Sequence, residues 1–135
     1  MRARTFWCNI ECVAVRVLIV DDNESFLDAA RVLLEQEHVH VAGVASTVAG
    51  GLRGAEELRP EVVLVDIFLG RESGLDLARR LIERDSIGGL AVILVSTHAH
   101  EDVADLIADS PAVGFLPKSE LSADAIRRIL SDGSR

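Results

Sequence analysis

Short apolar runs alternate along the chain with stretches in which apolar residues recur at helical spacing. The runs lie at residues 15–20, 39–44, 62–65, 90–95 and 112–116, and all are rich in valine, isoleucine or leucine. Largely apolar runs of this length are typical of strands that are covered on both faces. The stretches that follow them have the pattern of amphipathic helices. Five strands alternating with five helices predict an α/β fold, in which a parallel sheet has helices on both faces.

Local signals indicate where the helices begin and end. Asn, Ser and Thr supply side-chain oxygens that cap the first N–H groups of a helix, whereas Pro and Gly stop one. The expected caps are Asn23 or Ser25, Ser46 with Thr47, Ser73 with Asp76, and Ser122; the expected stops are Pro60, Gly88 with Gly89, and Pro111. The buried stripe of the first helix is expected to consist of Phe26, Ala30, Leu33 and Leu34.

Polar residues stand where four of the five strands end. Asp21 and Asp22 follow the first run, and Asp66 closes the third. Ser96 follows the fourth run, and Lys118, the only lysine in the chain, follows the fifth after one proline. Right-handed crossovers bring the carboxyl ends of parallel strands to one edge of the sheet, which is where ligands bind. We therefore expect these five side chains to meet at that edge.

The residue types in this set suit phosphoryl transfer. Three neighbouring carboxylates repel one another unless a hard cation such as Mg²⁺ holds them ionised. Asp66 can then attack a phosphoryl group, while Lys118 and the Ser96 hydroxyl contact its oxygens. Taken singly, an acidic pair at a helix start, a serine at a turn and a lysine at the surface are ordinary features. Their combination favours a phosphoryl-transfer site.

Composition and charge restrict the classes of partner. The 135 residues suffice for one domain, and the net charge of −8 opposes direct binding of nucleic acid. No apolar run approaches the ~20 residues of a membrane span, so we expect no membrane association. Cys8 and Cys12 lack partner ligands for a metal and are interpreted as incidental thiols in a reducing, cytoplasmic setting. Residues 1–14 have no clear period and are expected to be a loose extension, followed by one domain at 15–131 and a tail at 132–135.

The motifs around the polar positions resemble those of bacterial response-regulator receiver domains, which act in two-component signalling. The matching pieces are Leu-Ile-Val-Asp-Asp ending at Asp22, Val-Asp-Ile-Phe-Leu around Asp66 with Gly74 eight residues later, Leu-Val-Ser ending at Ser96, and Gly-Phe-Leu-Pro-Lys ending at Lys118. The resemblance covers nearly all of the chain beyond its first fourteen residues. It implies a flavodoxin-like, doubly wound sheet of five parallel strands in the order 2-1-3-4-5.

The resemblance also implies a role for each residue of the acidic site. Asp66 would accept a phosphoryl group from a sensor histidine kinase. The domain would catalyse this transfer, and the later loss of the group, on itself alone rather than as an enzyme with a separate substrate. Asp22, Asp66 and the backbone carbonyl of Phe68 would bind Mg²⁺ directly, with Asp21 acting through water. Lys118 would contact the phosphoryl group.

A conformational switch is a further implication of the resemblance. Ser96 would move towards the phosphoryl group and Phe115 would turn inward behind it, which would alter a protein-interaction surface on the fourth helix, fifth strand and fifth helix. Because the sequence shows no effector domain after that helix, we expect the output to be contact with a downstream protein that the sequence does not identify. A homodimer through this surface, pairing acids of the fourth helix with Arg127 and Arg128, is a second hypothesis.

Three residues beside the site are expected to tune its chemistry. Thr97 is bulkier than the alanine usual in the family and narrows access to the phosphoryl group, while Phe68 and His98 occupy the two positions that govern its loss. Because an apolar ring at position 68 hinders an attacking water, we expect slow autodephosphorylation. Pro117 precedes Lys118, whereas the family usually has a proline after the lysine, and this leaves the loop geometry open, including the cis peptide usual there.

Three other interpretations remain open at this stage. An aspartate-nucleophile phosphatase of the haloacid-dehalogenase type would need a second acid two residues after Asp66, where Phe68 stands. A flavodoxin-like nucleotide binder would need a phosphate loop rich in Ser, Thr and Gly, whereas residues 21–24 are Asp-Asp-Asn-Glu. A receiver that serves as a constitutive interaction module, never phosphorylated, would have no need for the intact set of acids, serine and lysine.

Overall fold

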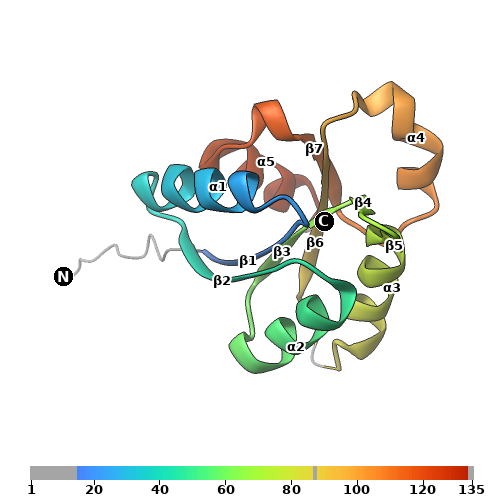
Figure 1. Ribbon diagram of the computed structural model, residues 1–135, viewed down its shortest axis with the longest axis horizontal. Helices are drawn as coiled ribbons and strands as arrows, with labels where there is room; N and C mark the ends of the chain where they lie inside the picture. Colours follow the sequence, from blue (N-terminus) through green and yellow to red (C-terminus); the bar gives the residue numbers. More distant parts are fainter. Residues whose placement is uncertain (1–14, 87, 134–135) are drawn as a thin grey trace.

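A parallel sheet of five strands forms the centre of the molecule. The computed structural model describes residues 15–86 and 88–133, and the extension and the end of the tail expected from the sequence lie outside them (Figure 1). The strands lie in the order β2 (His40–Ala45), β1 (Arg16–Val20), β3 (Val62–Asp66), β6 (Ala91–Ser96) and β7 (Gly114–Pro117), all parallel. Since β6 and β7 are the fourth and fifth strands of this sheet, the predicted flavodoxin-like order 2-1-3-4-5 is confirmed.

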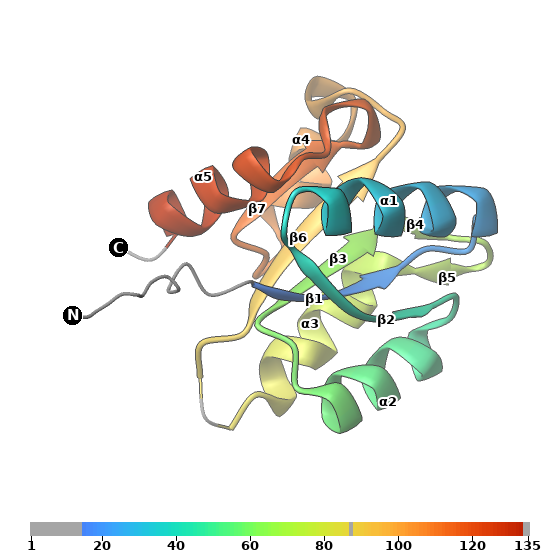
Figure 2. The ribbon, with the colours of Figure 1, turned by 90° about the vertical axis from the view of Figure 1, so that its left-hand side faces the viewer.

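Helices cover both faces of the sheet. The helices α1 (Glu24–Gln36) and α5 (Ala123–Gly133) lie on one face, whereas α2 (Val48–Leu58) and α3 (Gly74–Arg84) lie on the other (Figure 2). Alternate residues of β3 divide the core between them. Leu64 packs with the α1 and α5 layer, and Val65 packs with α2, α3 and Val103 of α4 (His100–Ala108). No helix in the described part of the chain is both long and apolar enough to span a membrane.

The helix caps follow the sequence, but the end of α3 does not. The caps whose side-chain oxygen accepts a hydrogen bond from a backbone N–H of the first turn are Asn23, Thr47, Ser73 and Ser122. α3 ends at Arg84, so the prediction that it continues to Gly88–Gly89 is wrong. The Asp85 carboxylate accepts a hydrogen bond from Leu90 N at 2.9 Å and closes the turn earlier. The two glycines instead have positive φ angles in the loop that leads into β6.

The face that α1 turns to the core differs slightly from the prediction. Leu27, Ala30 and Leu34 are buried, whereas Phe26 and Leu33 are only half-buried. The expected stripe included Phe26 and missed Leu27, because neighbouring positions of a helix are both apolar here and the pattern alone does not choose between them. As a result the Phe26 ring is left at the carboxyl edge of the sheet.

A short hairpin after β3 was not predicted and shapes the edge of the sheet. β4 (Phe68–Leu69) and β5 (Glu72–Ser73) pair antiparallel, whereas no strand was predicted between Asp66 and the next helix. Gly70 at the turn has φ +61°, a left-handed conformation that glycine adopts without strain. Gly74 then begins α3 so close to the strand that an added Cβ would lie 1.8 Å from the carbonyl oxygen of Asp66. The path of the chain beside Asp66 therefore depends on glycine at position 74.

Candidate functional site

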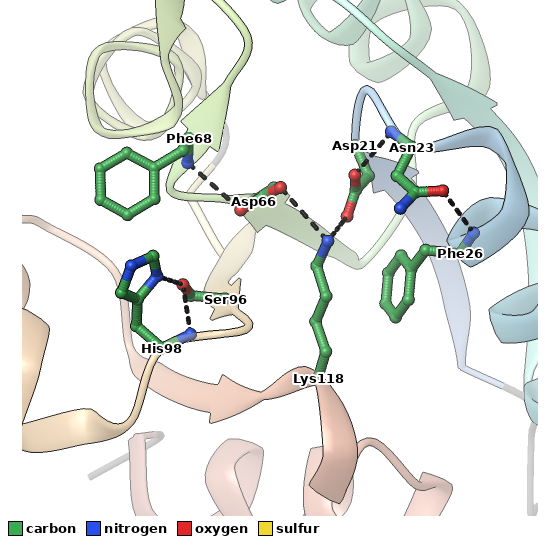
Figure 3. A network of polar contacts seen from close by, with 8 residues as sticks. All are labelled: Asp21, Asn23, Phe26, Asp66, Phe68, Ser96, His98 and Lys118. Carbon is green, nitrogen blue, oxygen red and sulfur yellow. Dashed lines mark hydrogen bonds and ion pairs between the residues drawn. The ribbon is translucent and has the colours of Figure 1, made fainter.

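The polar residues expected at the carboxyl edge of the sheet do come together there. Asp21 directly follows β1, Asp66 and Ser96 are the last residues of β3 and β6, and Lys118 directly follows β7 in a short 3-10 turn. Asp21, Asp66 and Ser96 are buried, with 0%, 6% and 1% of their surface exposed, whereas Asp22 is exposed. Figure 3 shows this edge of the sheet from close by. Two carboxylates, those of Asp21 and Asp66, are thus buried at the edge of the apolar core.

Three carboxylates form the centre of the site. One oxygen from each of Asp21, Asp22 and Asp66 lies within 4.8 Å of the others. Hard oxygen donors at this spacing fit a divalent cation such as Mg²⁺, which binds proteins through one or two carboxylates, water and phosphate oxygens. The Phe68 carbonyl, a further ligand implied by the resemblance, stays a prediction. The Phe68 N–H donates a hydrogen bond to Asp66 Oδ1 at 3.2 Å.

The Lys118 ammonium lies between two of these acids. Nζ donates a hydrogen bond to Asp66 Oδ2 at 3.3 Å and lies 2.5 Å from Asp21 Oδ2 in an ion pair that lacks hydrogen-bond geometry. Only 12% of the Lys118 side chain is exposed, so solvent ions screen these contacts little. The peptide bonds of the described loop, including those of Pro117, are trans. The lysine therefore balances part of the negative charge that the acids bring together.

Burial changes the acidity of Asp66. Removal from water raises the pKa of its carboxyl group above the ordinary value of 3.8, and the neighbouring Asp21 charge adds to the rise. The Phe68 N–H and the Lys118 ammonium lower this pKa but do not cancel the effect of burial. Ionised Asp66 is therefore costly to the folded protein, and a cation bound beside it would relieve that cost.

The Ser96 hydroxyl is engaged by His98 rather than by Asp66. Ser96 Oγ accepts a hydrogen bond from the backbone N–H of His98 at 3.0 Å and lies 3.1 Å from His98 Nδ1 (Figure 3). The His98 ring is in turn packed against the Phe68 ring, with centroids 5.2 Å apart. Any donation from Ser96 to a phosphoryl oxygen would compete with the contact to His98.

The remaining predicted residues lie around this centre. Thr97 is exposed directly after β6. Phe115 of β7 is half-buried, and its ring meets His100, the first residue of α4, in an edge contact with centroids 5.7 Å apart. Through this contact β7, which leads to Lys118, packs against the start of α4.

Asn23 and Phe26 also belong to the site, although the sequence suggested only a cap and a core position for them. The Asn23 N–H donates to Asp21 Oδ1 at 2.8 Å, and its side-chain oxygen accepts from Phe26 N at 3.1 Å. The Phe26 ring centroid lies 4.4 Å from Lys118 Nζ. The available signal was position, because Phe26 falls in the first turn of the helix that starts beside the acidic pair.

Comparison with known families identifies the class of this protein. The sequence matches the response regulator receiver domain over residues 17–130. Because this match covers most of the 135 residues, the chain belongs to the response regulator receiver family. The resemblance inferred from the motifs is confirmed.

Curated relatives of the chain are longer proteins. It is 30% identical over 113 residues to the transcriptional regulatory protein MctR of Rhizobium johnstonii, covering 83% of this chain and 51% of that protein. It is 28% identical over 117 residues to the transcriptional regulatory protein LiaR of Bacillus subtilis, covering 84% and 54% respectively. The chain thus spans about half the length of these relatives.

Solved structures show the same fold. A CheY-like response regulator receiver domain protein from Methanospirillum hungatei is similar with a TM-score of 0.73 at 26% identity, covering 90% of this chain and 97% of that one. A response regulator protein from Burkholderia pseudomallei is similar with a TM-score of 0.74 at 25% identity, covering 89% and 69%. The latter crystal structure contains a phosphorylated aspartic acid, a calcium ion and citrate.

Proposed function

We propose that this receiver domain accepts a phosphoryl group on Asp66 from a phosphohistidine of a sensor histidine kinase. The observation that carries the proposal is a buried carboxylate at the end of β3 with Lys118 Nζ 3.3 Å from Oδ2 and oxygens of Asp21 and Asp22 within 4.8 Å. The phosphorylated aspartic acid of the similar Burkholderia pseudomallei protein supports it. The domain acts on itself alone and has no separate substrate to turn over.

The transfer exchanges one bond to phosphorus for another. A carboxylate oxygen of Asp66 attacks phosphorus while the bond to the donor breaks, releasing the imidazole of phosphohistidine, which takes up a proton, or acetate when acetyl phosphate is the donor. The chemistry depends mainly on positioning and on neutralising the oxygens of the moving group. Lys118 supplies a positive charge at this place by exchanging part of its contact with Asp21 and Asp66 for a phosphoryl oxygen. Water later attacks phosphorus, which releases phosphate and restores the Asp66 carboxylate.

Mg²⁺ is the proposed cofactor because the donor set fits it. When bound, the cation neutralises charge on the carboxylates and on the transferred group. Asp22 and Asp66 are proposed as direct ligands together with the Phe68 carbonyl. Asp21 is proposed to act through water, since its Oδ1 already accepts from the Asn23 N–H and its Oδ2 is paired with Lys118.

The arrangement favours this proposal over its rivals. A phosphatase acting on separate esters needs a proton donor two residues after the nucleophile, and the Phe68 ring there supplies none. A constitutive interaction module gains nothing from a buried carboxylate whose ionised form is costly, because such groups weaken a fold unless they serve a function.

We further propose that the output lies on the face formed by α4, β7 and α5. Phosphorylation is expected to draw Ser96 away from His98 and to turn Phe115 inward, which breaks the ring contact with His100 at the start of α4. A downstream protein, or a second copy of the chain, would then bind the changed face. The acids of α4 and the arginines of α5 are exposed, and Arg127 also lies 3.5 Å from Asp124 on its own helix.

Transfer of label from acetyl [³²P]phosphate tests the proposed function. In the presence of Mg²⁺ the unsubstituted chain should take up label that alkali and hydroxylamine release, as expected of an acyl phosphate. Asp66→Asn should take up none, while Asp76→Asn, a matched change on α3 away from the site, should be labelled normally. Equal labelling of Asp66→Asn would refute the assignment.

A further inference from the structure

The structure assigns a positioning role to Phe26, and we propose that its ring holds the Lys118 ammonium where a phosphoryl oxygen on Asp66 has to be met. The inference rests on the proposed phosphoryl transfer and adds a residue that acts on it only through Lys118. The observation behind it is a contact between the first turn of α1 and the turn after β7, shown in Figure 3. Lys118 Nζ lies 4.4 Å from the centroid of the Phe26 ring.

A closed circuit of contacts fixes the geometry of this ring. Asp21 Oδ1 accepts from the Asn23 N–H at 2.8 Å, and Asn23 Oδ1 accepts from Phe26 N at 3.1 Å. The Phe26 ring then faces Lys118 Nζ, which is paired with Asp21 Oδ2 at 2.5 Å. The same acidic loop thus positions both the carboxylate that attracts the ammonium and the aromatic face that covers it.

An aromatic face suits a lysine that has to move. The negative face of the ring attracts the ammonium electrostatically, and it does so without taking up any of the three N–H donors of the side chain. Those donors stay available for carboxylate and phosphoryl oxygens. A hydrogen-bonding side chain at position 26 would instead compete for one of them, whereas an aliphatic side chain would fill the space without attracting the charge.

Burial distinguishes Phe26 from an ordinary core residue. Leu27 occupies the fully buried position of this turn, with 6% of its surface exposed, while Phe26 is half-buried. The Lys118 side chain beside it is 12% exposed, so the ring forms part of the cover that keeps water from the ammonium. Weak screening of this kind strengthens both the contact with the ring and the ion pairs beside it.

The first test uses the fact that Lys118 is the only lysine in the chain. Labelling with ¹³C-lysine therefore gives a single set of side-chain NMR signals, and the ring current of Phe26 should shift the signals of the Lys118 methylene next to Nζ upfield. Phe26→Leu should remove this shift and Phe26→Tyr should keep it. Leu33→Ala, which removes a half-buried core contact from the same helix, should leave it unchanged.

The second test measures binding of beryllium fluoride, a phosphoryl mimic, with Mg²⁺ present. Phe26→Leu should weaken binding by roughly threefold to thirtyfold, the range expected for loss of a cation–aromatic contact. Phe26→Tyr should bind nearly as well as the unsubstituted chain. In a Lys118→Met background, Phe26→Leu should have no further effect, because Phe26 has then lost the group through which it acts.

The outcomes separate this inference from the proposed function. If the unsubstituted chain fails to bind the mimic, the proposed function is refuted and the role of Phe26 with it. If the chain binds the mimic and Phe26→Leu binds equally well, the role of Phe26 alone is refuted. An equal loss of affinity in the Lys118→Met background would also refute it, because Phe26 would then act on the site merely through the fold.

Discussion

The Phe68 ring is the side chain most directly placed to control the lifetime of a phosphoryl group on Asp66. It lies two residues along the chain, its backbone N–H is bound to Asp66 Oδ1, and 46% of its surface is exposed. An apolar ring cannot orient an attacking water, whereas an amide can. We predict that Phe68→Asn increases the rate of autodephosphorylation about tenfold, which corresponds to about 1.4 kcal/mol in the barrier.

The lifetime can be measured by loading the chain with acetyl phosphate, removing the donor, and following phosphate release. Val32→Asn is the matched control. Val32 is also exposed, at 56%, but it lies on α1 and is not one of the site residues. A lifetime of seconds in the unsubstituted chain, or an unchanged rate in Phe68→Asn, would contradict the account.

His98 acts on the same site through Ser96. Its Nδ1 lies 3.1 Å from Ser96 Oγ, so this contact favours the conformation without a phosphoryl group. A hydrogen bond of this kind contributes about 0.5–1.5 kcal/mol. We predict that His98→Ala lowers, about threefold, the beryllium fluoride concentration required for half-saturation. His40→Ala, an exposed histidine of β2, should change nothing, and equal titration curves for both variants would contradict the prediction.

At the scale of elements, the charges of α4 and α5 offer a way to join two copies of the chain. The α5 face exposes Arg127 and Arg128. The exposed acids opposite in charge are Glu101, Asp102 and Asp105 of α4 and Asp109 directly after it. We predict that a chain activated by beryllium fluoride associates, and that replacing both arginines by glutamate weakens this association about tenfold or more. Arg79→Glu with Arg80→Glu on α3 is the matched control. Unchanged sedimentation of the activated Arg127 and Arg128 variant would contradict the proposed dimer.

The strands and helices were predictable because their signals are local. The apolar runs of β1, β3 and β6 are buried along nearly their whole length. Capping residues such as Asn23 and Ser73 mark the starts of the helices that follow them. The β4–β5 hairpin was not predictable in this way, because each of its strands is only two residues long. Its path also depends on how closely Gly74 approaches the Asp66 carbonyl. The early end of α3 was missed because the Asp85 carboxylate, not a glycine, closes that turn.

The site was predictable in its acids and its lysine, but not in its aromatic residues. Chain topology alone brings the ends of β1, β3, β6 and β7 to one edge, so Asp21, Asp66 and Lys118 could be placed together before their distances were known. The contact of Phe26 with Lys118 depends on the rotation of α1 about its axis, which the adjacent apolar residues Phe26 and Leu27 leave undetermined in the sequence pattern. The contact of His98 with Ser96 depends on a loop conformation that no spacing rule encodes.

For the molecule as a whole, burial of Asp66 makes stability depend on pH. Since the pKa of this carboxyl group is raised in the folded protein, the folded state binds the proton more tightly than the unfolded chain does. The free energy of unfolding contributed by Asp66 is therefore highest at pH below the ordinary value of 3.8, and falls as pH rises through the raised pKa. We predict that Asp66→Asn has a higher Tm than the unsubstituted chain at pH 7, and that the difference shrinks in acid.

Thermal unfolding followed by circular dichroism checks this dependence. Mg²⁺ should raise the Tm of the unsubstituted chain more than that of Asp66→Asn, because the cation relieves a charge that the variant lacks. Asp76→Asn, at a partly exposed carboxylate on α3, should not have a higher Tm than the unsubstituted chain at pH 7. Mg²⁺ should raise its Tm as much as it raises that of the unsubstituted chain. A lower Tm for Asp66→Asn at neutral pH would contradict the account of the site.

The central claim is that one carboxylate at the end of β3 takes up a phosphoryl group. Intact-mass spectrometry after incubation with acetyl phosphate and Mg²⁺ tests it most directly. The account predicts a single added phosphoryl group on the unsubstituted chain, located on Asp66 by peptide mapping, and no addition to Asp66→Asn. An unmodified native chain, or the same mass increase in the variant, would contradict it.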